Sequence, residues 1–254
     1  MKVYFIGAGP GAIDLITVRG ANVLKKSPIV LYAGSLVSRD ITEYCGPDTE
    51  IHDTASLNLD EQIELYQKAF SEDRDVARVH SGDPAIYGAT GEQMAKLRDL
   101  KIDFEIVPGV SSYSAAAAVM EVELTKPNVG QTIILTRTEG RASPMPENES
   151  LEALAALKTT LCIFLSGANL PDTLDILKAH YDLNTPIALA RRVTWDAEKI
   201  HKSTLGKILE EIQLNDWNLT TLLIIGDVMD NSEAEYSKLY SASYSHKFRK
   251  AVKA

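Results

Sequence analysis

The chain begins with MKVYFIGAGPGAIDL at residues 1–15, where a short apolar strand, Val3–Ile6, runs directly into three glycines. The spacing over residues 7–12 fits the looser G-x-G-x-x-A form of the dinucleotide-binding turn. A dinucleotide site also needs an acidic residue at the end of the second strand, to hold the ribose hydroxyls. The second strand here, Ile29–Tyr32, is followed by Ala-Gly-Ser, and Pro10 removes one N–H from the turn. A tight strand-to-helix turn is therefore favoured over a phosphate-binding loop.

Outward from this strand, short runs rich in Val and Ile alternate with stretches of helical period. The first half has predicted strands at Val3–Ile6, Ile29–Tyr32, near Ile51, Val76–His80 and Phe104–Val107. Leu59, Ile63, Tyr66 and Phe70 lie at helical spacing, and Ser111–Met120 has the alanine-rich composition of a packed helix. This alternation predicts an α/β fold with a largely parallel sheet.

The same pattern restarts from about residue 122. Predicted strands follow at Gln131–Thr136, Leu161–Leu165, Ile187–Ala190 and Thr221–Ile225, with helices at 150–158, 171–179 and 205–213. A long loop is expected at 138–150, which contains two prolines and several polar residues. We predict two α/β domains, residues 1–112 and 113–230, followed by a polar tail at 231–254 that is frayed or loosely helical.

Composition limits the classes of function. The chain has 254 residues, of which 45% are apolar and 24% charged, with a net charge of −9. Such a balance argues against nucleic acid and against an anionic membrane surface as partners. Two distant cysteines and five histidines form no metal-ligand spacing, so we expect reduced thiols and no protein-bound metal. No secretory leader or membrane-spanning run is evident, and a cytoplasmic protein is expected.

Three predicted strands end in small, turn-forming residues. The first is followed by Gly7–Gly11, another by Ser81–Gly88, and a third by Gly109–Ser112. In an open α/β sheet a ligand binds outside the carboxyl ends of the strands, and glycine there permits close approach of the backbone. The sequence therefore predicts a ligand site on this rim.

These segments resemble the tetrapyrrole (uroporphyrinoid) methylases. The resemblance is carried by Gly7–Gly11 with Asp14-Leu15, Ser81-Gly82-Asp83-Pro84, Val107–Ser112, Leu31–Val37 and Ile133–Arg141, and it covers about residues 1–230. The first loop departs from the family pattern, because Ala12-Ile13 stand where Gly-Asp-Pro usually continues. The resemblance implies two domains of that family's fold with the ligand cleft between them, and a homodimer.

The implied activity is transfer of a methyl group from S-adenosylmethionine to carbon 11 of precorrin-4 or cobalt-precorrin-4, in cobalamin biosynthesis. The Gly-Asp-Pro-x-Ile-Tyr-Gly version of the second loop is more similar to the cobalt branch. Such a reaction needs alignment of donor and acceptor and exclusion of water, rather than an activated nucleophile or a metal. By resemblance, the donor site consists of Pro10, Gly82, Asp83, Pro84, Ile86, Tyr87, Ser111, Ser112, Leu165, Ala190, Arg191 and Gly226.

The acceptor carries several carboxylates, whereas the protein is acidic, so local arginines are expected to recognise it. The implied substrate-binding residues are Gly9, Gly11, Asp14, Arg137, Arg141 and Arg192, with Arg191 and Arg19 as further candidates. The first glycine loop is then expected to face the macrocycle. No catalytic residue is assigned, although Arg141 and His80 are candidates, and His80 is the conceivable base. A turn-capping Asp83 and a structural His80 are the simpler alternatives.

Three other functions remain open at this stage. The first is methylation of a different ring carbon by the same kind of enzyme. The second is an NAD(P)-dependent oxidoreductase, which the missing ribose acid disfavours. The third is a non-catalytic tetrapyrrole carrier, which would have no need of S-adenosylmethionine.

Overall fold

The structure is a computed structural model that describes residues 1–139, 144–230, 241 and 243–251. The chain divides into two compact units, Met1–Ala116 with Arg192–Glu198, and Ala117–Arg191 with Lys199–Ala254. This division differs from the predicted one at residue 112 in two ways. The boundary falls inside helix α4 (Ser112–Val119), and the segment 192–198 returns to the first unit.

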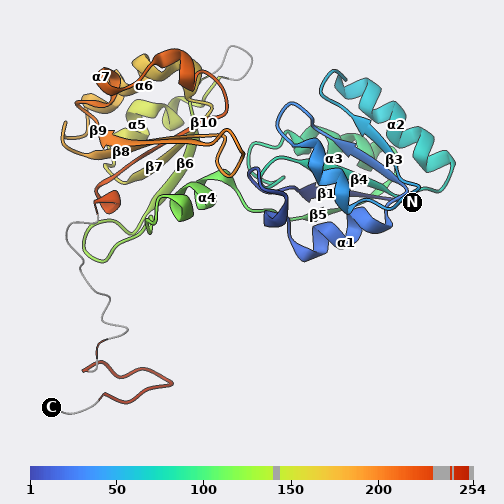
Figure 1. Cartoon of the computed structure of the whole chain (residues 1–254), viewed down its shortest axis with the longest axis horizontal. Coiled ribbons are helices and arrows are strands. Elements are labelled where there is room, and N and C mark those ends of the chain that lie inside the picture. The colour runs from blue at the N-terminus through green and yellow to red at the C-terminus, as the bar shows by residue number, and fades with distance from the viewer. Residues whose placement is uncertain (140–143, 231–240, 242, 252–254) are drawn as a thin grey trace. The chain divides into compact units, whose positions relative to one another are not determined.

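The first unit contains a five-stranded sheet with the order β3-β2-β4-β1-β5 (Figure 1). Every neighbouring pair is parallel, which confirms the predicted sheet. The inner strands β2 and β4 are buried along their whole length, so their sequences read as continuous apolar runs rather than alternating ones. The strands are β1 (Lys2–Gly7), β2 (Ile29–Tyr32), β3 (Glu50–Asp53), β4 (Val76–His80) and β5 (Asp103–Val107).

Helices cover both faces of this sheet (Figure 1). Helix α1 (Val18–Lys26) packs Leu24 against one face, whereas α2 (Leu59–Ser71) and α3 (Thr90–Asp99) form the core on the other. A reciprocal capping box between Asn58 and Glu61 begins α2. Sequence periodicity wrongly assigned Phe70 to the buried stripe of α2: Phe70 is 50% exposed, and its neighbour Ala69 is buried in its place.

The second unit contains a mixed sheet with the order β6-β7-β10-β8-β9. Only β6 and β7 are parallel, and the other three pairs are antiparallel. The expectation of a repeated, largely parallel pattern is therefore wrong here, because no helix separates β8 from β9 and the chain turns back directly into an antiparallel pair. The strands are β6 (Ile133–Arg137), β7 (Thr160–Phe164), β8 (Pro186–Arg191), β9 (Lys199–Thr204) and β10 (Thr221–Ile225).

Strand β9 was missed because its sequence, KIHKST, has no apolar run and forms a partly exposed edge. Helices α5 (Leu151–Ala155), α6 (Leu170–Lys178) and α7 (Ile208–Glu211) contribute to one apolar core with β7, β8 and β10. Of the predicted helices, 171–179 is right within one residue. The helix predicted at 205–213 is only the single turn α7, which a 3-10 turn, Leu214–Trp217, follows.

The remaining segments are irregular. A 3-10 turn, Glu147–Glu149, lies in the predicted loop at 138–150, of which residues 140–143 lie outside the described part. Most of the predicted tail, 231–240, 242 and 252–254, is also outside it. Within the part that is described, none of the helices has the length and apolarity to cross a bilayer.

Candidate functional site

Three loops at the carboxyl edge of the first sheet lie backbone against backbone. The amide of Gly9 donates to the Gly82 carbonyl at 3.3 Å, and the amide of Gly82 donates to the Gly9 carbonyl at 2.8 Å. A Cβ on Gly109 would lie 2.1 Å from the Gly82 oxygen and 2.7 Å from the Cα of Gly7. A side chain does not fit at Gly7 or Gly109, which is why glycine stands at these two positions. The structure thus confirms that the three loops share one rim.

Asp83 joins two of these loops. One of its carboxylate oxygens accepts from the amide of Ala85 at 2.8 Å, and the other accepts from the amide of Gly109 at 3.1 Å. The Thr90 hydroxyl donates to the carbonyl of Pro84 at 3.0 Å and so connects the same loop to the start of α3. This is the turn-capping role named as the alternative for Asp83, and a direct contact with a ligand stays a prediction.

Two predicted site residues, Tyr87 and Leu165, have left-handed backbone. Several non-glycine residues with positive φ, such as Asp73 and Lys101, follow helices, where this conformation is common. Leu165 (φ 54°) instead follows strand β7 directly, and Tyr87 (φ 53°) lies in the loop between β4 and α3; they are 65% and 47% exposed. A bulky residue held there costs about 1–3 kcal/mol, and such strain collects at binding sites. Both residues belong to the predicted donor site.

The first glycine loop is in contact with two side chains of the protein, Trp195 and Thr194. A Cβ on Gly11 would lie 2.3 Å from Cδ1 of Trp195, whose indole N–H donates to the carbonyl of Pro10 at 2.8 Å. The amide of Ala12 donates to the hydroxyl oxygen of Thr194 at 2.9 Å. Gly11 therefore makes room for an indole ring rather than for a phosphate. Sequence reasoning missed Trp195 and Thr194, because nothing in their local pattern links them to a loop some 180 residues earlier.

His80 is a buried structural residue rather than a base. Burial, and secondarily the nearby Arg78 guanidinium, lower the pKa of His80 to about 3, against a hydrogen bond with the Gly88 backbone that raises it. Its Nε2 atom is buried without a partner. A neutral imidazole of such low basicity is unsuited to take a proton near neutral pH. The simpler of the two interpretations of His80 is therefore favoured.

Beside His80, Arg78 is 5% exposed and is bonded only to neutral groups in the contacts described, the Thr54 hydroxyl at 2.9 Å and the Gln93 amide oxygen at 3.4 Å. Tyr66 donates to the same amide oxygen at 2.9 Å. These hydrogen bonds connect β4 to α2 and α3. A single charged residue inside the apolar strand VARVH was the sequence signal for them, and sequence reasoning did not use it.

The other predicted site residues of the first unit differ in their exposure. Pro10, Gly9 and Pro84 are buried, Ser111 is 8% exposed, and Ser112 begins α4. Asp14 and Arg19 are exposed, on the 3-10 turn Ile13–Leu15 and on α1, and Ile86 is half-buried between Asp83 and Tyr87.

Second-unit candidates fall at both ends of the second sheet. Leu165 and Arg191 lie at the carboxyl ends of β7 and β8, and the Leu165 carbonyl accepts from the Thr138 hydroxyl at 3.0 Å. Strand β10 runs antiparallel to both, with Ile225 opposite Leu161, so Gly226 lies at the other end of the sheet. Ala190 is 1% exposed, within β8.

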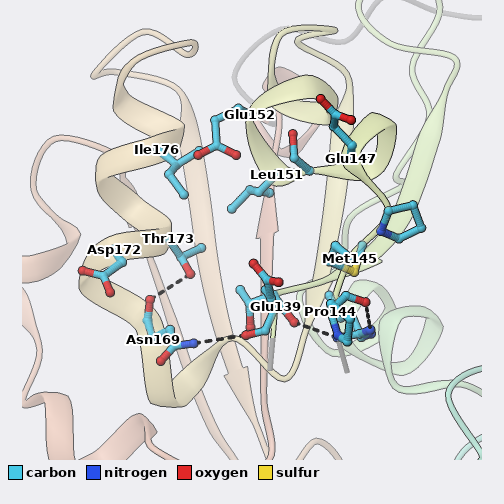
Figure 2. A pocket seen from close by; sticks show the side chains of 14 residues that line it. Glu139, Pro144, Met145, Glu147, Leu151, Glu152, Asn169, Asp172, Thr173 and Ile176 are labelled. Carbon is cyan, nitrogen blue, oxygen red and sulfur yellow. Dashed lines mark hydrogen bonds between the residues drawn. The ribbon is translucent and has the colours of Figure 1, made fainter. Parts of the chain in front are cut away.

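Arg137 borders a cavity of about 890 Å³ in the second unit (Figure 2). Its guanidinium donates to the carbonyls of Thr138 at 3.1 Å and Pro144 at 3.3 Å. Leu151 and Ile176 supply apolar surface, and the acidic side chains in the wall are Glu139, Glu147, Glu152 and Asp172. These described walls suit a cation better than a polycarboxylate. Arg141, the other arginine predicted here, lies outside the described residues.

Comparison with known proteins gives a consistent result. The family described as Tetrapyrrole (Corrin/Porphyrin) Methylases matches residues 2–209. A cobalt-precorrin-4 C(11)-methyltransferase from Methanocaldococcus jannaschii is 42% identical over 254 residues, 99% of this chain and 97% of that protein. A precorrin-4 C(11)-methyltransferase from Pseudomonas aeruginosa is 44% identical over 250 residues, 98% of this chain and 99% of that protein. A solved cobalt-precorrin-4 methyltransferase superposes with a TM-score of 0.86 at 42% identity, covering 90% of this chain and 96% of that one.

Proposed function

This chain belongs to the tetrapyrrole (corrin/porphyrin) methylase family, and from that membership we propose that it methylates carbon 11 of precorrin-4 or cobalt-precorrin-4 with S-adenosylmethionine. The observation that carries the proposal is identity of 42–44% over nearly the whole of both chains with relatives of that activity. The close-packed glycine loops and the strained strand ends support it, because they are the positions that the family pattern assigns to ligands.

The chemistry fits the residues present. The ring carbon attacks the methyl carbon, the S–CH₃ bond breaks, and its electron pair neutralises the sulfonium to leave S-adenosylhomocysteine. A proton then leaves the macrocycle. Because charge disperses in this transition state, alignment of sulfur, methyl and carbon and exclusion of water supply the acceleration. A rim built from rigid backbone suits that task better than a set of titrating groups.

We place the donor beside the Gly82 loop. Gly82 is buried, and a Cβ on it would lie 3.7 Å from the Cα of Ser111 and 3.9 Å from the carbonyl oxygen of Val110. These are ordinary contact distances, whereas a Cβ on Gly7 or Gly109 would clash with backbone atoms. The exposed Tyr87, the buried Ser111 and the half-buried Ser112 belong to the neighbouring loops, and the strained Leu165 is the strongest candidate in the second unit. Ala190, Arg191 and Gly226 complete the proposed donor set.

Titration with S-adenosylhomocysteine tests the donor, with NADH as the control ligand. We expect saturable binding of one nucleoside per chain and no heat with NADH. Gly82→Val should abolish that binding while the protein remains folded, because its new Cβ would meet protein atoms only at ordinary contact distances of 3.7 Å or more. Binding of NADH alone would instead support an oxidoreductase, and macrocycle binding without S-adenosylhomocysteine binding would support a carrier.

Product analysis tests the acceptor. Incubation with carbon-13-labelled donor and either precorrin-4 or cobalt-precorrin-4 should give one new methyl resonance, bonded to carbon 11. A label on another ring carbon would identify a different C-methyltransferase of the family. The ratio of kcat/KM for the two macrocycles assigns the chain to the cobalt or the cobalt-free branch.

We also propose that the enzyme is a cytoplasmic homodimer, as the family resemblance implies. Sedimentation of the purified chain tests the dimer, and a monomer at micromolar concentration would contradict it.

A further inference from the structure

The segment 192–198 is unusual in this fold because it follows a strand of the second unit but packs within the first. It closes on itself, since the amide of Thr194 donates to a carboxylate oxygen of Glu198 at 2.6 Å and the amide of Trp195 donates to the Arg192 carbonyl at 3.0 Å. Two of its residues, Arg192 (φ 47°) and Thr194 (φ 66°), have left-handed backbone. A β-branched residue rarely adopts that conformation unless its surroundings impose it.

Contacts with the first glycine loop account for the left-handed backbone of Thr194. Thr194 accepts from the amide of Ala12, Trp195 donates to the carbonyl of Pro10, and the absent side chain of Gly11 leaves room for the indole. Pro10 is buried, so its carbonyl has no access to bulk water if the indole N–H is removed. The contact therefore fixes the loop and the segment together.

The same contact fixes Arg192. Its guanidinium carbon lies 5.8 Å from the centre of the Trp195 ring, within cation–π range, and the residue is exposed. Among the ion pairs of the described residues, none involves Arg192. An arginine that is held by a ring on one side and left open on the other is prepared to bind a planar carboxylate.

We propose that Arg192 anchors a side-chain carboxylate of the tetrapyrrole, and that Trp195 and Thr194 are positioning residues that hold this arginine and the Gly9–Ala12 loop in place. The inference rests on the proposed function for the identity of the macrocycle. The family resemblance already implied Arg192 as a substrate-binding residue; the inference adds that it belongs to the first unit and that Trp195 and Thr194 hold it in position.

The test compares Arg192→Gln with Arg98→Gln. Arg98 is an exposed arginine on α3 whose guanidinium carbon lies 5.1 Å from the Phe104 ring centre, so it matches Arg192 in charge and in stacking. We expect Arg192→Gln to raise the KM for precorrin-4 about ten- to hundredfold, the range of a charge-assisted hydrogen bond, and to leave the Kd for S-adenosylhomocysteine unchanged. Arg98→Gln should change neither constant.

Trp195→Phe and Thr194→Val test the positioning role. Each should raise the KM for precorrin-4 by about fivefold, the effect of one lost neutral hydrogen bond. Each should then have almost no further effect in the Arg192→Gln background, because a positioning residue acts only through the group that it positions. A residue that merely stabilised the fold would have the same effect in both backgrounds.

A binding assay separates this inference from the proposed function. Uroporphyrin III, a stable polycarboxylate, is titrated against wild type, Arg192→Gln and Arg98→Gln by fluorescence quenching. Weaker binding by Arg192→Gln alone supports the anchor even if no methyl group is transferred to precorrin-4. Unchanged uroporphyrin III binding and unchanged KM in Arg192→Gln would overturn the anchor, and so would a loss confined to S-adenosylhomocysteine.

Discussion

Substitution of Gly109 by alanine tests whether close backbone packing decides the geometry of the rim. The new Cβ would lie 2.1 Å from the carbonyl oxygen of Gly82 and 2.7 Å from the Cα of Gly7, whereas real Cβ contacts stay beyond 3.0 Å. One backbone must therefore retreat by about 0.9 Å. Overpacking typically costs about 1–3 kcal/mol, and here the clashing atoms are all backbone and cannot rotate away. We expect a loss of about 3 kcal/mol in the free energy of unfolding.

Gly82→Ala is the matched control, because it adds the same methyl group to the partner loop. Its Cβ has no neighbour within 3.7 Å, so only the left-handed φ of 63° opposes the change. That conformation costs alanine about 1–2 kcal/mol, and reduced freedom of the unfolded chain returns about 0.4–1 kcal/mol. The expected net loss is about 1 kcal/mol, clearly smaller than for Gly109→Ala.

Urea unfolding is followed by the fluorescence of Trp195, in a Trp217→Phe background. Trp195 and Trp217 are the only tryptophans, and they belong to different units, so the remaining one reports on the first unit alone. Equal unfolding free energies for the two alanine variants would refute the packing argument. A selective loss of S-adenosylhomocysteine binding in Gly82→Ala would further support the donor position.

Three further predictions concern the same chain. His80 has a folded pKa of about 3, below its ordinary value of 6.5, so stability is fully present above pH 6.5 and falls by about 1.4 kcal/mol per pH unit on acidification toward pH 3. In His80→Asn the slope of unfolding free energy against pH between 6 and 4 should therefore be shallower, and an unchanged slope would remove His80 as its source. Burial raises the pKa of the Cys162 thiol to about 12, so iodoacetamide at pH 8 should label Cys45 before Cys162 in the folded protein, as peptide mass spectrometry would show. Asn58→Ala should cost about 1 kcal/mol through loss of the capping box of α2, measured by the same urea unfolding, and no loss would mean that this cap is dispensable.

Local sequence patterns were sufficient to predict most strands and the ligand-site loops of the first unit. Short apolar runs and stretches of period 3.6 are set by residues that are neighbours in the chain, and their alternation predicted β1, β2, β4 and β5 and the parallel sheet. Turn-forming residues predicted the loops, because a close approach of two backbones requires glycine whatever the rest of the fold. The family motifs lie in these loops, which is why the sequence also indicated the activity.

Only the tertiary structure shows how the strands of the second sheet pair and which residues contact the first glycine loop. The sequence contains strands for the second sheet, but their directions depend on which strands meet, and the edge strand β9 has too few apolar residues to be recognised. The opening glycines are the clearest case. Residues 1–15 by themselves indicate a strand and a tight turn, and the lack of an acidic residue after Ile29–Tyr32 disfavours a nucleotide. In the folded chain this turn contacts Trp195 through a hydrogen bond and through packing of the indole against Gly11. The two segments are some 180 residues apart in the sequence, so no local pattern predicts their contact.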